Sequence, residues 1–189
     1  MKLQKLIIHN IASIEHAEID FEAEPLASSE VFLITGKTGA GKTTILDAIC
    51  LALYNNTPRL ESKYFDDKIV DNQDLMQAND KRQLMRKNTT EAWVELTFTG
   101  SNGIPYKVSW YVALGRKKIG QKIQDKQWNL TNLKDNTTMT KTNEITTEIQ
   151  TAIGLDFSQF CRTTMLAQGE FTRFVRSKDD ENAAILEKT

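Results

Sequence analysis

Residues 31–54 read VFLITGKTGAGKTTILDAICLALY, and this stretch decides the fold class. It opens with four consecutive apolar residues, which are typical of a short strand buried in a parallel sheet. A glycine-bearing loop follows at once. From Thr43 onward the apolar residues recur at helical spacing, and the segment NNTP at 55–58 ends that pattern. The sequence therefore predicts a strand, a loop and a helix in that order.

The loop of this unit fits the pattern G-x-x-x-x-G-K-[ST] over residues 36–43. Glycines let the backbone curl so that successive N–H groups point into one anion-sized hollow, and the following helix adds its positive end. We expect Lys42 to reach the β- and γ-phosphates, Thr43 to hold Mg²⁺ and Thr44 to lie nearer the α-phosphate. The predicted phosphate-binding set is Gly36, Lys37, Thr38, Gly39, Ala40, Gly41, Lys42, Thr43 and Thr44.

This loop indicates a triphosphate with magnesium, but it does not separate an ATPase from a GTPase or a small-molecule kinase. A turn that merely joined a strand to a helix would need neither Lys42 nor Thr43. Hydrolysing enzymes of this class also need an apolar strand that ends in an acidic residue. The apolar runs here end instead in Thr35-Gly36, Thr99-Gly100 and Gly115-Arg116. The chain is thus expected to bind nucleotide without the whole hydrolytic machinery.

The composition is that of one globular domain. The chain has 189 residues, of which 40% are hydrophobic and 26% charged, with a formal net charge of -1. Bulk charge therefore gives no reason to expect nucleic acid or a membrane. No apolar stretch is long enough for a span or a secretory signal, so we expect a cytoplasmic location. Cys50 and Cys161 lack CxxC spacing, and we interpret them as buried apolar side chains without assigned chemistry.

Alternation and helical spacing predict the remaining elements, giving an α/β fold with a mixed sheet, an antiparallel β meander and flanking helices. Residues 59–90 are predicted to be an irregular excursion. The predicted strands are 2–10, 17–22, 92–99, 106–114, 127–133 and 163–167, with turn chemistry at 100–103. The predicted helices are 143–153, a short entry at 156–160, one beginning at 171–175, and 179–189, which is rich in helix-forming residues.

Three stretches carry a resemblance: IIHNIASIEHAEIDF at 7–21, ITGKTGAGKTTILDAICLALYNNTPRL at 34–60 and LDFSQFCRTTMLAQGEFTRFV at 155–175. They resemble the N-terminal ATPase segment of the SbcC family, and the QDLM stretch at 73–76 adds to the match. These ABC-type ATPases are the large subunits of bacterial DNA-repair nucleases and are akin to structural maintenance of chromosomes proteins. Such a combination is far more specific than a phosphate loop alone.

The resemblance implies a P-loop ATPase head of ABC type that is split in two. Residues 1–178 would be its N-terminal lobe, and residues 179–189 would begin a coiled-coil helix, so that the chain is truncated at the root of the coil. The acidic strand and the signature motif would lie in the C-terminal half. ATP binding and hydrolysis would be coupled to processing of DNA double-strand ends, whereas this chain alone would be nearly inactive as an ATPase. The implied partners are the C-terminal half-head, a second head in a homodimer, an SbcD-like metallophosphoesterase nuclease and double-stranded DNA, with no membrane.

The resemblance also assigns roles to residues outside the phosphate loop. Gln168 would be the Q-loop residue, acting with Lys42 in catalysis and with Thr43 at the metal. Asn10 and Ser13 would lie near the α-phosphate and ribose, although Ala12 stands where many relatives have a basic residue. Arg86, between Met85 and Lys87, would lie against the adenine, with a solvated basic turn as the alternative. Asp47 matches a frequent aspartate of the family, which is equally consistent with a structural contact.

The basic residues on or near the predicted hairpin are candidates for DNA contact, because phosphate neutralisation needs clustered cations. A solvated face is the plainer interpretation of such a run. These residues are Lys81, Arg82, Arg86, Lys87, Arg116, Lys117, Lys118 and Lys122. Trp93, Trp110 and Trp128 fall on predicted strands, where we expect packing before base stacking.

Two alternative functions stay open from the sequence. One is a self-contained P-loop kinase for a nucleoside or small metabolite, which the lack of an Arg-rich lid segment disfavours. The other is a nucleotide-binding scaffold that does not hydrolyse ATP.

Overall fold

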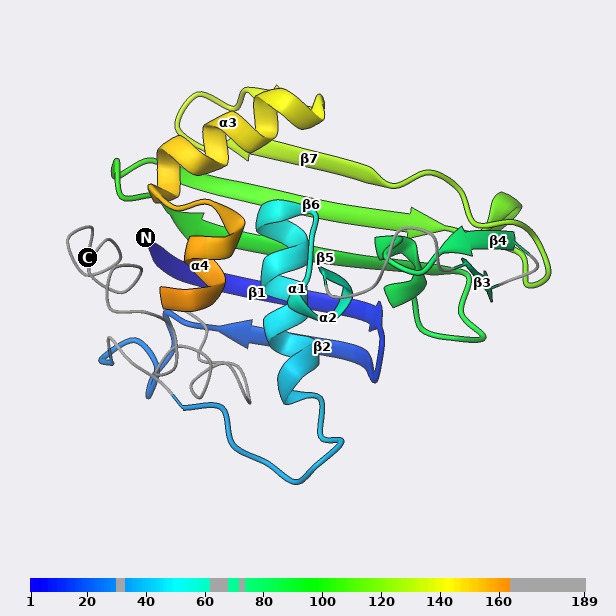
Figure 1. Ribbon diagram of the computed structural model, residues 1–189. Helices are drawn as coiled ribbons and strands as arrows, with labels where there is room; N and C mark the ends of the chain where they lie inside the picture. The colour runs from blue at the N-terminus through cyan, green and yellow to red at the C-terminus, as the bar shows by residue number, and fades with distance from the viewer. Residues whose placement is uncertain (30–32, 62–67, 72–73, 164–189) are drawn as a thin grey trace, which may run out of the picture.

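The computed structural model describes residues 1–29, 33–61, 68–71 and 74–163 (Figure 1). Six strands form one sheet in the order β2-β1-β5-β6-β7-β8, and each neighbouring pair is antiparallel. These strands are β1 (Lys2–Ile11), β2 (Ile14–Asp20), β5 (Glu91–Thr99), β6 (Pro105–Ala113), β7 (Gln127–Asn132) and β8 (Thr138–Met139). A separate antiparallel pair consists of β3 (Lys68–Asp71) and β4 (Asp74–Gln77).

Helices cover one face of the large sheet. Figure 1 shows α1 crossing this face, with α4 beside it and α3 near β7. In β5 and β6 every second residue is buried, as expected for strands with one covered face. The helices are α1 (Lys42–Tyr54), α2 (Pro58–Glu61), α3 (Thr142–Ile153) and α4 (Phe157–Thr163), with 3₁₀ turns η1 (Lys81–Leu84) and η2 (Gly115–Lys117).

The C-terminal half of α1 is anchored to β6 and β7 by two buried tryptophans. The indole N–H of Trp128 donates to the Ala52 carbonyl at 2.7 Å, and that of Trp110 donates to Oδ1 of Asn55 at 3.0 Å. Asn55 is also the C-cap of α1, in the left-handed conformation that ends helices. These bonds satisfy the polar edge of each ring while the rest of it packs in the core, which confirms the packing role expected of both residues.

The α/β class and the antiparallel meander are confirmed. The first strand, the 92–114 hairpin, the strand from Gln127 and the helices that end near Tyr54 and Ile153 agree with the sequence prediction to within one or two residues. Gly154 caps α3 with a positive φ of 81°. The strands and the helix that ends at Ile153 were predictable because one face of each is buried, which gives the sequence a regular apolar period.

Several predictions were wrong where periodicity was short. Leu33 and Ile34 lie outside any strand and Leu33 is 86% exposed, so the predicted buried strand does not hold there; Val31 and Phe32 are outside the described residues. A short apolar run indicates side chains that favour burial, but it does not specify which element they pack against. The second strand begins at Ile14 because it pairs with β1 from the turn onward.

The 59–90 segment is more ordered than predicted, since it contains most of α2 and all of β3, β4 and η1. Thr163 ends α4 rather than beginning a strand. The other elements predicted beyond it, including the coiled-coil start at 179–189, lie outside the described residues.

Candidate nucleotide-binding site

The phosphate loop leads directly into α1, whose first residue is Lys42. Gly39 and Gly41 both have the left-handed backbone, with φ of 85° and 89°. A Cβ on Gly41 would lie 3.2 Å from Cγ1 of Ile14, at the start of β2. Position 41 therefore needs glycine both for its backbone conformation and for the close approach of the β1–β2 turn.

The N-terminal end of α1 keeps its polar groups open toward the loop. Its N-cap is Gly41, which has no side chain to accept a hydrogen bond from the first-turn amides, and the first turn has no acidic residue. The unpaired N–H groups and the helix dipole make such an end attractive to anions. This 13-residue helix thus offers the amides that the loop pattern predicts.

Lys42 folds back over the loop that precedes it. Its ammonium donates to the carbonyl of Gly36 at 2.7 Å and to that of Lys37 at 2.8 Å. In the part of the chain that the structure describes, no carboxylate pairs with this ammonium, and a phosphate would supply the counter-charge. Thr43 is exposed at the same end of the helix, so its hydroxyl can reach a metal that a bound triphosphate carries. These residues fit a magnesium–triphosphate group.

The β1–β2 turn brings further predicted residues to the start of α1. The hydroxyls of Ser13 and Thr44 are 3.0 Å apart, and Thr44 is 2% exposed. Nη1 of Arg86 donates to the Ser13 carbonyl at 2.9 Å, and the backbone N–H of Arg86 donates to the Asn10 carbonyl at 2.8 Å. Ser13, Thr44 and Arg86, which are distant in the sequence, therefore meet beside the phosphate loop.

Asn10 is the predicted contact whose side chain points elsewhere. Its amide donates to the Glu91 carbonyl at 3.0 Å and lies 3.0 Å from Nε2 of His9, and its φ of 53° is left-handed. These contacts show a structural role in joining β1 to β5. Gln168 lies outside the described residues.

Asp47 and Arg59 form an ion pair that the sequence analysis missed. The carboxylate is 2% exposed, and its Oδ2 lies 2.6 Å from Nη2 of Arg59 at the start of α2. Burial raises the pKa of the Asp47 carboxyl, and the guanidinium opposes that rise. The pair ties α2 to the phosphate-loop helix. Asp47 thus makes the structural contact that was one of its two interpretations, and nothing in the sequence alone joins it to Arg59.

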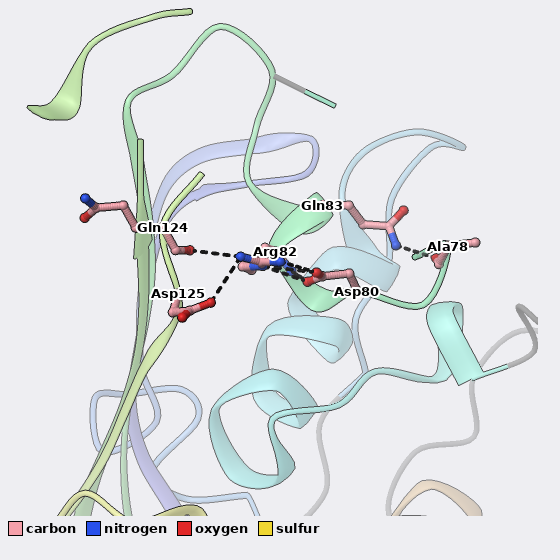
Figure 2. Close-up of polar contacts among 6 residues, drawn as sticks. All are labelled: Ala78, Asp80, Arg82, Gln83, Gln124 and Asp125. Carbon is pink, nitrogen blue, oxygen red and sulfur yellow. Dashed lines mark hydrogen bonds and ion pairs between the residues drawn. The ribbon is translucent and has the colours of Figure 1, made fainter. Parts of the chain in front are cut away.

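The basic residues do not form one free cationic surface. Nζ of Lys117 lies 2.5 Å from the Glu91 carboxylate and 5.9 Å from the centre of the Tyr111 ring. Figure 2 shows Arg82 reaching Asp80 on one side and Asp125 with the Gln124 carbonyl on the other. Paired cations attract phosphate less than unpaired ones, so the group as a whole is weaker evidence for DNA than its sequence suggests.

Asp80, Arg82 and Asp125 line a polar hollow of about 270 Å³, which shares no residue with the phosphate loop. Burial would raise the pKa of Asp80, but its hydrogen bonds from the Arg82 side chain and backbone prevail and lower it. Asp80 also caps η1 through the Arg82 backbone N–H at 2.9 Å. The acid therefore serves local structure.

The sheet, the helix docked on it and the glycine loop at the start of that helix define an α/β fold of the P-loop class. The profile of the AAA domain family matches residues 5–189. The chain belongs to this family.

Several proteins of known name are similar to this chain in sequence. The SbcC component of the nuclease SbcCD from Pseudomonas aeruginosa is 39% identical over 191 residues, which is 100% of this chain and 16% of the relative. The same component from Rhodobacter capsulatus is 37% identical, over 100% of this chain and 15% of the relative. A probable DNA double-strand break repair Rad50 ATPase of Aquifex aeolicus is 27% identical over 82% of this chain and 13% of its own length. This chain therefore spans only 13–16% of the length of these relatives.

A solved structure of the recombination mediator protein RecF with ATP superposes with a TM-score of 0.49 and 17% identity. It covers 76% of this chain and 29% of the RecF chain. No helix in the described part of the chain has the length and apolar character needed to cross a membrane.

We predict that Gly41→Ala destabilises the protein by about 1–3 kcal/mol, because alanine is strained at this φ and its methyl would press on Ile14. Urea unfolding measures the change. Gly103→Ala is the matched control, since Gly103 also has a positive φ of 75° but a Cβ there would meet nothing within 4 Å. Equal losses in the two variants would mean that Ile14 does not crowd position 41.

We predict that Asp80→Asn lowers the free energy of unfolding by about 1 kcal/mol at pH 7. This loss should shrink as the pH falls below 3.8, the ordinary pKa of an aspartate carboxyl. The folded-state pKa is lowered, so the carboxylate stabilises the fold above that value and loses its effect as protons bind. Urea unfolding at several pH values measures the difference from the unmodified chain. Asp125→Asn, at a fully exposed partner of Arg82, should change stability little at any pH. A cost for Asp80→Asn that does not change with pH would contradict this account.

Proposed function

We propose that this chain is the ATP-binding N-terminal lobe of an SbcC-like ATPase, which couples ATP binding and hydrolysis to the processing of DNA double-strand ends. The observation that carries the proposal is the Lys42 ammonium, held by the Gly36 and Lys37 carbonyls of the glycine loop that leads into α1. The names of the relatives, a component of the SbcCD nuclease and a double-strand break repair ATPase, support the DNA-repair setting. The location proposed for this chain is therefore the cytoplasm.

In this proposal the loop amides and Lys42 bind the triphosphate of ATP, and Thr43 binds the Mg²⁺ that accompanies it. Lys42 leaves the Gly36 and Lys37 carbonyls for phosphate oxygens, which carry the charge that the carbonyls lack. Thr44 and Ser13 border the α-phosphate end, and Arg86 borders the base, since all three lie beside the loop. Gln168 would serve the metal and the attacking water.

The proposed partners follow from the resemblance, which places the acidic strand in a C-terminal half-head, and from the names of the relatives. A C-terminal half-head would supply the acidic and signature residues, and a second head would close on the first with nucleotide between them. A metallophosphoesterase nuclease of SbcD type and double-stranded DNA would respond to that closure. We further propose that residues 1–178 form the lobe and that residues 179–189 begin a coiled-coil helix.

Nucleotide binding is tested by charge removal. We predict that Lys42→Ala weakens magnesium-dependent ATP binding about 10- to 100-fold, as expected for loss of a charge-assisted hydrogen bond to phosphate. Calorimetry with ATP and Mg²⁺ measures the affinity. Lys134→Ala, which removes an exposed lysine between β7 and β8, should leave it unchanged. The proposal fails if the unmodified, folded chain takes up no ATP, or if both variants bind it equally well.

Hydrolysis is tested by complementation. We predict that the chain alone hydrolyses ATP barely above background, because the apolar runs that end at Thr35-Gly36, Thr99-Gly100 and Gly115-Arg116 do not end in the acidic residue that positions water. Adding the matching C-terminal half should restore turnover, and Lys42→Ala should abolish it again. If both halves are folded and turnover does not return, a non-hydrolysing scaffold becomes the better description. Phosphate transfer to an added nucleoside or metabolite would instead favour the kinase.

A further inference from the structure

The two cysteines of the chain, which are 111 residues apart in the sequence, meet between two helices. Sγ of Cys50 on α1 lies 3.8 Å from Sγ of Cys161 on α4. Both are thiols in this structure. A disulfide needs a sulfur–sulfur distance of about 2.05 Å, so closure requires the sulfurs to approach by about 2 Å. Side-chain rotation with a small shift of the seven-residue α4 can supply this movement.

The surrounding side chains hold the two helices in this relation. The Tyr54 ring packs against Phe157 at 5.7 Å and against Phe160 at 5.3 Å between ring centres. The Tyr54 hydroxyl donates to the Leu155 carbonyl at 3.1 Å, just before α4 begins. Aromatic packing of this kind fixes the side of α4 that carries Cys161. The fold therefore sets the spacing of α1 and α4 that brings the two cysteines together.

The two thiols differ in access. Cys50 is 0% exposed, whereas Cys161 is partly exposed. An oxidant dissolved in water therefore meets Cys161 first, and Cys50 reacts within the protein. This division between an accessible thiol and a sheltered neighbour is what a sulfenic acid requires to be resolved as a disulfide.

We propose that Cys50 and Cys161 are a redox modification site, which a peroxide converts to a disulfide that joins α4 to the phosphate-loop helix. The Cys161 thiolate attacks one peroxide oxygen, the O–O bond breaks, and the second oxygen leaves as water after taking up a proton. The Cys50 sulfur then attacks the sulfur of the resulting sulfenic acid and loses its proton, and a second water departs. Two thiols are oxidised, one peroxide is reduced to two waters, and a thiol reductant reverses the change.

The disulfide changes what α4 can do. In the thiol form α4 is held on α1 by side-chain packing, and it can separate without breaking a covalent bond. In the disulfide form the two helices are linked, and a loop of more than one hundred residues is closed. Closing so long a loop restricts the unfolded chain and raises the melting temperature of the folded one. The inference rests on the two thiols alone and does not need the proposed ATPase function.

The test uses the full chain, reduced, freed of reductant and then treated with hydrogen peroxide. We expect a monomer lighter by about 2 Da, both cysteines blocked to alkylation after denaturation, and full recovery with dithiothreitol. A peptide map without reductant should join the peptides of Cys50 and Cys161. The melting temperature of the oxidised chain should exceed that of the reduced chain by about 5–10 °C.

Cys161→Ser is the matched control, because it removes the accessible thiol at a partly exposed position. Peroxide should leave its mass and its melting temperature unchanged, and Cys50 should stay available to alkylation after denaturation. Over-oxidation of Cys161 in the unmodified chain with Cys50 still a thiol would overturn the proposal. Disulfides formed only between molecules would overturn it as well.

Discussion

The docking of α1 on the sheet is the constraint on which the rest of the structure depends. Its residues from Ala48 to Leu53 are almost wholly buried, and the indole of Trp128 binds its last turns. Apolar burial supplies the driving force, whereas the hydrogen bond to a buried carbonyl fixes where along the sheet the helix comes to rest. Because a helix is rigid, fixing its C-terminal half also fixes the position of its N-terminal amides.

The fixed N-terminal end of α1 holds the glycine loop in the conformation of a candidate phosphate-binding site. The β1–β2 turn approaches the helix through Ile14 and Ser13, and it can do so because Gly41 has no side chain. The same glycine leaves the first-turn amides uncapped. Among the described residues, the ion pairs do not include Lys42, whose ammonium rests on two carbonyls. Positive charge and open amides are thus brought together before any anion arrives.

Sequence periodicity predicted the parts of this arrangement that depend on one buried face, such as β5, β6 and α3. The loop pattern located Lys42 and Gly41, because their chemistry is local. Contacts between residues that are distant in the sequence could not be predicted from such local patterns. Arg59 meets Asp47 only because α2 turns back on α1, and Ser13 meets Thr44 only because β2 begins at that turn. The prediction of a buried strand at Leu33 was wrong for a different reason. An apolar residue is not always buried, and this one is exposed.

The two ends of α1 carry separate chemistry, and the helix geometry keeps them apart. Cys50 comes eight residues after Lys42, which corresponds to about 12 Å along a helix axis. A bond between Cys50 and Cys161 therefore touches none of the groups expected to bind phosphate, and loss of Lys42 leaves the thiol contact intact. Tyr54, one turn beyond Cys50, is held by α4 through ring packing and through the Leu155 carbonyl. Consequently, covalent linkage at this end would act on the attachment of α4, whereas anion binding would act on the loop, and each can be measured while the other is absent.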